Sequence, residues 1–265
     1  MCLIILAHQM WSDQPLVVSA NRDEFFARPT AAAHFWASNP AILAGQDLEQ
    51  GGTWLGFTRQ GRFAAITNYR DPARTLPAPR SRGELTLDYL NGTRSPEDYL
   101  QAIASRADDY AGFNLLLADR DSLWYFSNSG AEGSRHARQL SPGLYGLSNA
   151  SLDTPWPKVE LGKERLRDLS GGALNHDALL AVVSDRQLAT PEALHRQGLT
   201  GEMDQALSAQ FIQAGVYGTR CSTTLWTDRD GRAHWRETSY DETGATTGVV
   251  EEAFSLEATA QATGL

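Results

Sequence analysis

The chain opens on Met1-Cys2-Leu3-Ile4-Ile5-Leu6-Ala7, and the fold prediction starts from the apolar run between Cys2 and Ala7. A short, continuous apolar run of this kind is typical of a strand that is buried on both faces. A second run, Leu16 to Ala20, follows the turn-forming segment from Met10 to Pro15. Two strands joined by a short polar turn predict a hairpin, which brings the polar residues after Ala20 back beside Cys2.

Cys2 is the residue of this run whose chemistry goes beyond packing. It directly follows Met1, and a small second residue allows the initiator methionine to be removed, which leaves a cysteine with a free α-amine. The reference pKa is about 7.7–8.0 for such an amine and about 8.5 for a thiol, so the amine can take the thiol proton near neutral pH. This pair supports covalent catalysis. A free cysteine beside a buried strand is also common as a small apolar residue, so both interpretations stay open here.

Length and composition predict a globular protein and argue against one class of partner. The chain has 265 residues, enough for one large domain or two small ones, and its 42% hydrophobic and 21% charged residues are ordinary globular values. Its net charge is −9, and an acidic protein repels phosphate backbones. We therefore expect no nucleic-acid partner.

The cysteines, the histidines and the lengths of the apolar runs predict where the protein is located and whether it binds a metal or another cofactor. The two cysteines, Cys2 and Cys221, are too few for a disulfide framework and fit a reducing compartment. No apolar stretch approaches 18 residues and no basic segment precedes the first apolar run, so we expect no membrane-spanning helix and no signal peptide. The expected location is cytoplasmic. The six histidines lack metal-ligand spacing, so no metal or other cofactor is expected. The sequence leaves the oligomeric state open.

The order of predicted elements indicates a single α+β domain. A turn that leads into a strand is expected over 51–57, and further strands near 62–68, 113–118, 122–126, 140–149, 217–226 and 232–237. Helices are expected near 81–91, 95–107, 158–169, 176–184 and 191–195. The first helix has the capping-box spacing of Ser81 and Glu84, and Gly92 is its expected stop. The segment from Phe25 to Gln50 is expected to be irregular. Without βαβ alternation, repeats or a linker, we predict one domain over 1–255, with helices on antiparallel sheets, and a poorly ordered tail over 256–265.

Three polar segments close predicted strands and supply candidate site residues. Asn21-Arg22-Asp23-Glu24 follows the second strand, where a carboxylate can hold an ammonium and a guanidinium can stabilise a thiolate. Asn68 and Asn149 each end a strand and offer N–H groups to an oxyanion, although Asn is also simply common in turns. Arg220 lies in a strand pattern, where a half-buried arginine needs a partner. Cys221, which has no terminal amine, is expected to be structural.

The ordered series of motifs resembles the NRDE family, also called the transport-and-Golgi-organisation-2 family. The resemblance begins at Met1-Cys2 and at the tetrapeptide Asn21-Arg22-Asp23-Glu24. It continues through Arg28-Pro29, Gly51-Gly52-Thr53-Trp54-Leu55-Gly56, Thr67-Asn68-Tyr69-Arg70, Tyr145-Gly146-Leu147-Ser148-Asn149, Leu152 to Lys158 and Tyr217-Gly218-Thr219-Arg220. This series covers nearly the whole chain in order, which makes it far more specific than the tetrapeptide alone.

The resemblance implies a fold and a catalytic class. The family looks like a branch of the N-terminal-nucleophile hydrolases, which implies a four-layer αββα sandwich. Its characterised relatives are the choloylglycine hydrolase and penicillin V acylase group, in which a processed N-terminal cysteine attacks an amide. By this similarity Cys2 is the nucleophile and its own amine is the base.

The resemblance also implies roles for five further residues. Asp23 would hold the amine and Arg22 would support the thiolate. The side chain of Asn149 and the backbone of Asn68 would form the oxyanion hole, and Arg220 would be a distal cation. In the acylases the Arg and Asp are spaced apart, whereas Arg22 and Asp23 are adjacent. Neighbours on a strand point to opposite faces, so Asp23 is the stronger candidate of the two.

Two functions follow from these observations. The first is hydrolysis of a linear, non-peptide amide C–N bond through a thioester at Cys2, with a small-molecule acyl amide or related metabolite as the partner. The alternative is a non-catalytic haem or lipid-metabolite binding and trafficking protein on the same fold, with His8 as a candidate axial ligand. A structural protein with a vestigial site ranks third, because the polar positions match as a set.

Overall fold

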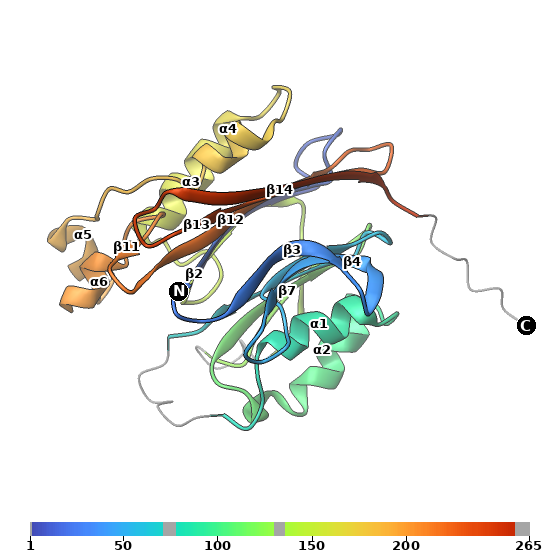
Figure 1. Ribbon diagram of the computed structural model, residues 1–265, viewed down its shortest axis with the longest axis horizontal. Coiled ribbons are helices and arrows are strands. Elements are labelled where there is room, and N and C mark those ends of the chain that lie inside the picture. The colour runs from blue at the N-terminus through green and yellow to red at the C-terminus, as the bar shows by residue number, and fades with distance from the viewer. Residues whose placement is uncertain (1, 71–77, 130–135, 258–265) are drawn as a thin grey trace, which may run out of the picture.

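The chain folds into four layers, helix–sheet–sheet–helix. The computed structural model describes residues 2–70, 78–129 and 136–257, so the predicted tail from 256 lies almost wholly outside the described residues. Two seven-stranded sheets pack face to face. α3 and α4 cover the outer face of one sheet, and α1 and α2 cover the outer face of the other (Figure 1). This is the predicted αββα sandwich, with antiparallel pairing between the strands in both sheets.

The first sheet contains the predicted N-terminal hairpin. Its order is β10-β1-β2-β12-β13-β14, with β11 beside β12. The hairpin places Cys2 directly opposite Arg22, and Arg22 lies directly opposite Cys221 on its other side. The strands are β1 (Cys2–His8), β2 (Leu16–Phe25), β10 (Gly143–Leu147), β11 (Gln213–Ala214), β12 (Tyr217–Thr227), β13 (Arg232–Tyr240) and β14 (Thr246–Ser255).

The second sheet follows chain order from β3 to β9. Its strands are β3 (Thr30–Trp36), β4 (Asn39–Asp47), β5 (Leu55–Thr58), β6 (Phe63–Asn68), β7 (Phe113–Ala118), β8 (Leu123–Ser127) and β9 (Arg138–Leu140). The prediction of an irregular segment from Phe25 to Gln50 was wrong, because most of it forms the β3–β4 hairpin. Its Ala-rich sequence has a weak β-propensity, and pairing with the rest of the sheet overrides that local preference.

The helices are short and lie outside the sheets. They are α1 (Gly83–Asn91), α2 (Pro96–Ala104), α3 (Pro157–Asp168), α4 (His176–Ala181), α5 (Pro191–His195) and α6 (Glu202–Ala206), with a 3-10 turn at Ala107–Asp109. α1 ends at Gly92 as predicted, but its cap is Arg82 and no side chain caps it. The carboxylate of Glu84 instead accepts a hydrogen bond from Tyr110 and pairs with Arg80. No helix in the described ranges is long and apolar enough to cross a membrane.

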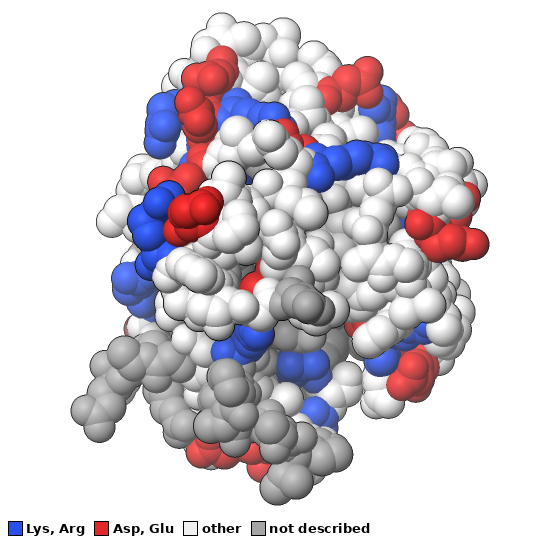
Figure 2. Space-filling view, turned by 90° about the vertical axis from the view of Figure 1, so that its left-hand side faces the viewer, with Lys and Arg blue, Asp and Glu red and all other residues white. Residues whose placement is uncertain are grey.

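Alternation along β1 and β2 decides which side chains enter the space between the sheets. Ile4 and Leu6 belong to the core cluster between the sheets, whereas their odd-numbered neighbours pack under α3 and α4. The same alternation turns Cys2 and Arg22 into the inter-sheet space and Asp23 toward the helical layer. At this end of the sandwich a cavity replaces the apolar packing. Figure 2 looks at that end and shows a hollowed face on which basic side chains gather near the hollow.

Candidate active site

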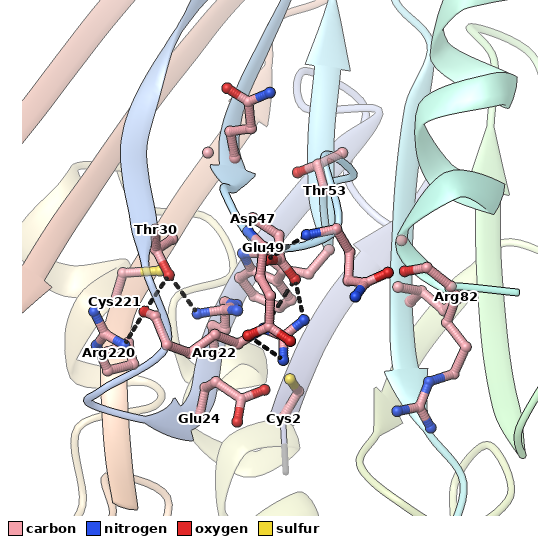
Figure 3. A pocket seen from close by; sticks show the side chains of 18 of the residues that line it. Cys2, Arg22, Glu24, Thr30, Asp47, Glu49, Thr53, Arg82, Arg220 and Cys221 are labelled. Carbon is pink, nitrogen blue, oxygen red and sulfur yellow. Dashed lines mark hydrogen bonds and ion pairs between the residues drawn. The ribbon is translucent and has the colours of Figure 1, made fainter. Parts of the chain in front are cut away.

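A cavity of about 640 Å³ opens between the two sheets, with Cys2 in its wall (Figure 3). Strands β2, β12 and β13 of one sheet and β3, β4 and β6 of the other line it, together with the start of α1. Its charged lining residues are Arg22, Arg28, Arg80, Arg82, Arg220, Asp23, Glu24, Asp47, Glu49 and Glu237. A space of this size suits a small molecule, since ligand pockets usually measure about 300–1,000 Å³.

Two hydrogen bonds hold the main chain of Cys2, and a third reaches its sulfur. Its backbone N–H donates to Asn149 Oδ1 at 3.2 Å, and its carbonyl oxygen accepts from Ser148 Oγ at 2.8 Å. The backbone N–H of Asp23 donates to the sulfur. The thiol therefore has a fixed place at the start of β1, next to the cavity.

Asn149 connects Cys2 with Asn68. Asn149 is buried, and its Nδ2 donates to the carbonyl oxygen of Asn68 at 2.8 Å. Asn68 ends β6 in the opposite sheet and lines the cavity. The two asparagines predicted from the sequence thus form one hydrogen-bonded chain with Cys2, and that chain bridges the two sheets. One amide hydrogen of Asn149 remains beyond the bond to Asn68, because a primary amide has two.

Arg22 and Asp23 occupy different faces of β2. Arg22 faces the cavity from its place opposite Cys2, and its side chain makes a long hydrogen bond, 3.4 Å, from Nη1 to Thr30 Oγ1. Asp23 accepts a hydrogen bond from the Thr219 hydroxyl at 2.7 Å on the other face. Both residues therefore lie at Cys2, Arg22 on its side-chain face and Asp23 behind the strand.

Burial dominates the protonation chemistry of the site. It raises the pKa of the Cys2 thiol, the negative charge of Asp23 raises this pKa further, and Arg22 opposes the rise. Burial also raises the pKa of Asp23 to about 6, which the positive charge of Lys158 opposes. At neutral pH the Asp23 carboxylate is therefore mainly ionised, whereas the Cys2 thiol needs a base or a nearby cation before it can attack.

Arg220 reaches the cavity through an irregularity in β12. The register between β12 and β2 shifts between Thr219 and Cys221, and Arg220 lies at that shift. Its Nη1 donates to the carbonyl oxygens of Phe25 at 2.8 Å and Arg28 at 3.1 Å. Of the six predicted site residues, all but the buried Asn149 line the cavity, and Asn149 bonds to two of them.

The site also contains residues that sequence reasoning did not select. Arg82 lies beside the cavity, and its Nη1 donates to the Gly112 carbonyl oxygen at 3.1 Å. Glu237 is 3% exposed, lines the cavity and accepts from the Ala33 N–H at 2.7 Å. Its carboxylate also accepts a hydrogen bond from the Cys221 thiol, and burial raises the pKa of both groups. Cys221, expected to be structural, thus also lines the cavity.

Lys158 is a fourth such residue, on the helical side of β2. It is buried at the start of α3, and its Nζ donates to the Leu207 carbonyl oxygen at 3.1 Å. Burial lowers its pKa, whereas Asp23 and Cys2 raise it through their negative charges. Its only signal in the sequence is its place at the end of the matched motif from Leu152 to Lys158.

The described ranges contain neither a set of metal ligands nor a pair of cysteines placed to form a disulfide. No set of three or more His, Cys, Asp or Glu side chains there is placed to hold a metal ion. Cys2 and Cys221 are free and lie on the two strands that flank β2. Strands are about 4.7–4.9 Å apart, so two strand spacings exceed the Cα separation of about 7 Å that a disulfide allows. His8, the candidate haem ligand, is buried at the far end of β1 and is not among the residues lining the cavity.

Fold and site together define an αββα sandwich with a cysteine at the start of its first strand, facing a cavity between the sheets. The sequence model of the family described as Transport and Golgi organisation 2 matches residues 1–242, and the chain belongs to this family. The Transport and Golgi organization protein 2 homolog of Bos taurus is 40% identical over 242 residues, which cover 84% of this chain and 86% of that protein. The Homo sapiens homolog is 37% identical over 243 residues, with the same coverage of both chains.

Two solved structures are similar at the level of overall shape. The Caenorhabditis elegans N-acylethanolamine-hydrolyzing acid amidase ortholog has 9% identity and a TM-score of 0.42, over 84% of this chain and 92% of that one. A mutant of the conjugated bile acid hydrolase from Clostridium perfringens has 9% identity and a TM-score of 0.44, over 97% of this chain and 92% of that one.

Proposed function

We propose that this protein is an amidohydrolase that cleaves the linear C–N bond of a small acyl amide through a thioester at Cys2. One observation carries the proposal: the Cys2 side chain faces a cavity of about 640 Å³, with Arg22 directly opposite and the Asp23 N–H at its sulfur. A thiol beside a guanidinium and a hydrogen-bond donor is the environment in which a thiolate is stabilised.

The mechanism begins with removal of Met1, which turns the Cys2 backbone nitrogen into an α-amine. That nitrogen lies 3.2 Å from Asn149 Oδ1, an acceptor for one hydrogen of the ammonium form. Asp23 provides a negative charge that favours the ammonium. The amine takes the thiol proton, which gives a thiolate that Arg22 stabilises.

The thiolate then attacks the carbonyl carbon of the amide and forms a C–S bond. The negative charge that develops on the carbonyl oxygen is stabilised by donors at the site, for which the second amide hydrogen of Asn149 is our candidate. The C–N bond breaks, and the leaving nitrogen takes the proton of the α-ammonium. A water then gives a proton to the α-amine and attacks the thioester carbon, which forms a C–O bond and breaks the C–S bond. The acid leaves, and the α-ammonium returns its proton to the sulfur, which restores the thiol and the free amine.

The mass of the intact protein tests this proposal directly. The purified protein should lack the mass of one methionine, and incubation with a panel of acyl amides and β-lactams should add an acyl mass at Cys2. The Cys2→Ala variant should lose turnover by about 10³-fold or more. Cys221→Ala is the matched control, because its thiol lines the same cavity without a terminal amine, and it should keep its adduct.

Three results would count against the hydrolase. Met1 retained on the active protein would rule out the amine as base, and turnover by Cys2→Ala would rule out the nucleophile. Ligand binding without any adduct or turnover would favour the non-catalytic alternative instead.

A further inference from the structure

The arginines that line the cavity fall into two groups. Arg28 is held by Asp47 at 2.7 Å and Glu49 at 3.3 Å, and Arg80 pairs with Glu84. The others, Arg22, Arg82 and Arg220, have no carboxylate within 4.0 Å in the described part of the chain. Three guanidinium groups in one cavity thus lack an anionic partner among those residues.

Arg22 is the most unusual of the three. Its exposed fraction is only 7%, and its bond to Thr30 is 3.4 Å long. Buried charges are normally paired, since removing an ion from water costs several kcal/mol unless another charge compensates it. A guanidinium has five N–H donors, so most of those on Arg22 have no partner among the described residues and can bond to a group that enters the cavity.

Arg82 and Arg220 are oriented but not neutralised. Each donates to main-chain carbonyl oxygens, which fix the direction of the side chain and leave its positive charge in place. In Figure 3 Arg82 lies on one side of Cys2, and Arg22 and Arg220 lie on the other. A ligand whose carbonyl group reaches Cys2 therefore has a guanidinium on either side of it in this view.

The acidic side chains of the cavity are engaged elsewhere. Glu24 accepts from the Phe25 N–H at 2.9 Å, Glu237 accepts from the Ala33 N–H, and Asp23 accepts from Thr219 on the far side of β2. Burial also raises the pKa of Glu237, which weakens its ability to balance a cation. These contacts leave the guanidinium groups available to an anion from outside.

We propose that the cavity binds an acyl compound that carries a carboxylate or phosphate group, with Arg82 and Arg22 as its anion-binding residues. The planar fork of an arginine matches the two oxygens of either group and forms paired, charge-assisted hydrogen bonds. The acyl character of the ligand rests on the proposed function, because it assumes a carbonyl at Cys2. Anion binding itself requires no turnover, so it is tested separately.

Titration calorimetry with matched eight-carbon ligands tests the inference on the Cys2→Ser variant, which keeps a hydroxyl in place of the thiol. Octanoate and octyl phosphate carry the two anionic groups, and octanamide is the uncharged match. We expect at least one anion to bind about tenfold more tightly than octanamide, since a hydrogen bond to a charged group is the stronger kind. Comparison of octanoate with octyl phosphate then identifies the preferred anion.

Arginine variants in the same background connect that preference with particular side chains. Arg82→Gln should bring the ratio of anion to octanamide affinity close to one, and Arg82→Lys should retain part of it. Arg80→Gln is the matched control, because that guanidinium lines the same cavity but already pairs with Glu84. It should keep the full preference, and thermal unfolding should show that all variants are folded.

Equal affinity for octanoate, octyl phosphate and octanamide would overturn the inference, as would a preference that survives both Arg82→Gln and Arg22→Gln. Anion binding without any Cys2 adduct would reject the hydrolase and leave the anion site standing. Turnover of uncharged amides without any preference for anions would reject the anion site and support the hydrolase.

Discussion

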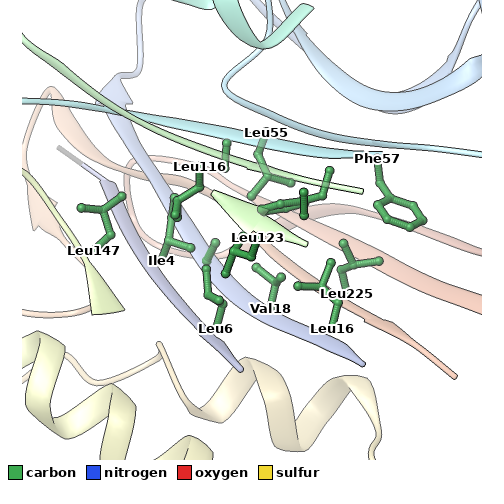
Figure 4. Packing of buried hydrophobic residues seen from close by; sticks show 14 of the residues in the cluster. Ile4, Leu6, Leu16, Val18, Leu55, Phe57, Leu116, Leu123, Leu147 and Leu225 are labelled. Atoms are coloured by element: carbon green, nitrogen blue, oxygen red, sulfur yellow. The ribbon is translucent and has the colours of Figure 1, made fainter. Parts of the chain in front are cut away.

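The space between the two sheets has two halves, built by the same strands with opposite chemistry. In one half Ile4 of β1, Val18 of β2 and Leu225 of β12 pack against Leu55 and Leu116 of the other sheet (Figure 4). In the other half Cys2, Arg22 and Cys221, on the same faces of the same three strands, line a cavity (Figure 3). The lining changes from apolar packing to cavity over two residues, from Ile4 to Cys2 on β1 and from Ala20 to Arg22 on β2.

This difference shows how a strand can serve a core and a site at once. Strand alternation fixes the direction in which each side chain points, and the residue type at that position decides whether it packs or reacts. The apolar half supplies burial, and the ends of the strands can then carry a thiol and a charged group that do not stabilise the fold. We expect substitutions in the two halves to separate stability from activity.

The largest effect on stability should come from truncating the core half. Ile4→Ala removes a side chain that is fully buried between the sheets, so it should lower the free energy of unfolding by about 3–4 kcal/mol, as buried truncations that leave a cavity usually do. Urea unfolding monitored by circular dichroism measures this loss. Cys2→Ala is the control on the same strand and face, and should change stability by less than about 1 kcal/mol. Equal losses in both variants would mean that the two halves are not distinct.

A smaller effect, of opposite sign, should follow from removing the buried charge behind the site. Asp23→Asn keeps an oxygen that accepts the Thr219 hydrogen bond but removes the carboxylate. We expect the free energy of unfolding at pH 7 to rise by about 1–3 kcal/mol, since a tenfold change in a protonation equilibrium corresponds to about 1.4 kcal/mol. Activity should fall strongly at the same time, because the α-ammonium loses its counter-charge.

The pH dependence of stability checks the origin of that gain. The pKa of Asp23 rises from its ordinary 3.8 to about 6 on folding, so between these values the folded protein holds more protons than the unfolded chain. Stability from this group therefore falls as pH rises through that window and stays low above it. Asp23→Asn should remove this part of the decline, whereas Asp230→Asn, in an exposed turn, should leave it unchanged. An unaltered pH profile in Asp23→Asn would contradict the assignment.

Local patterns in the sequence were sufficient to predict the two strands that bring Cys2, Arg22 and Asp23 together. The apolar runs of β1 and β2 and the short turn between them predict that the two strands pair as a hairpin. This pairing places Arg22 and Asp23 beside Cys2. The αββα arrangement, by contrast, came from the resemblance to a family, because periodicity alone indicated only helices on antiparallel sheets. The positions of Asn68 and Asn149 at strand ends were visible in the sequence, whereas the bond between them is a tertiary contact.

Other parts of the site gave no local signal. The β3–β4 hairpin, which supplies one wall of the cavity, is Ala-rich, and its strands exist because of their neighbours in the sheet. Strand β14 was not predicted either, since most of its residues are exposed and it pairs with β13 alone along the sheet edge. Glu237 looked like an ordinary strand residue, and only the packing of the second sheet makes it buried.

Lys158 was also missed, because only tertiary packing brings it close to Asp23. Replacing it should have the smallest effect on stability of the variants considered, and it tests the electrostatics of the site. Lys158→Met keeps the length of the side chain and removes one of the positive charges that hold the pKa of Asp23 down, so that pKa should rise above about 6. Stability should change by about 1 kcal/mol or less, because exchanging a buried charge for an apolar group is often nearly neutral. If ionised Asp23 is needed for turnover, the acid limb of the kcat/KM profile should move to higher pH, and below the pKa the ionised fraction should fall about tenfold for each pH unit that the limb moves. Lys163→Met is the control on the same helix, since Lys163 pairs with Asp153 instead. An acid limb that moves equally in both variants, or in neither, would place Lys158 outside the electrostatics of the site.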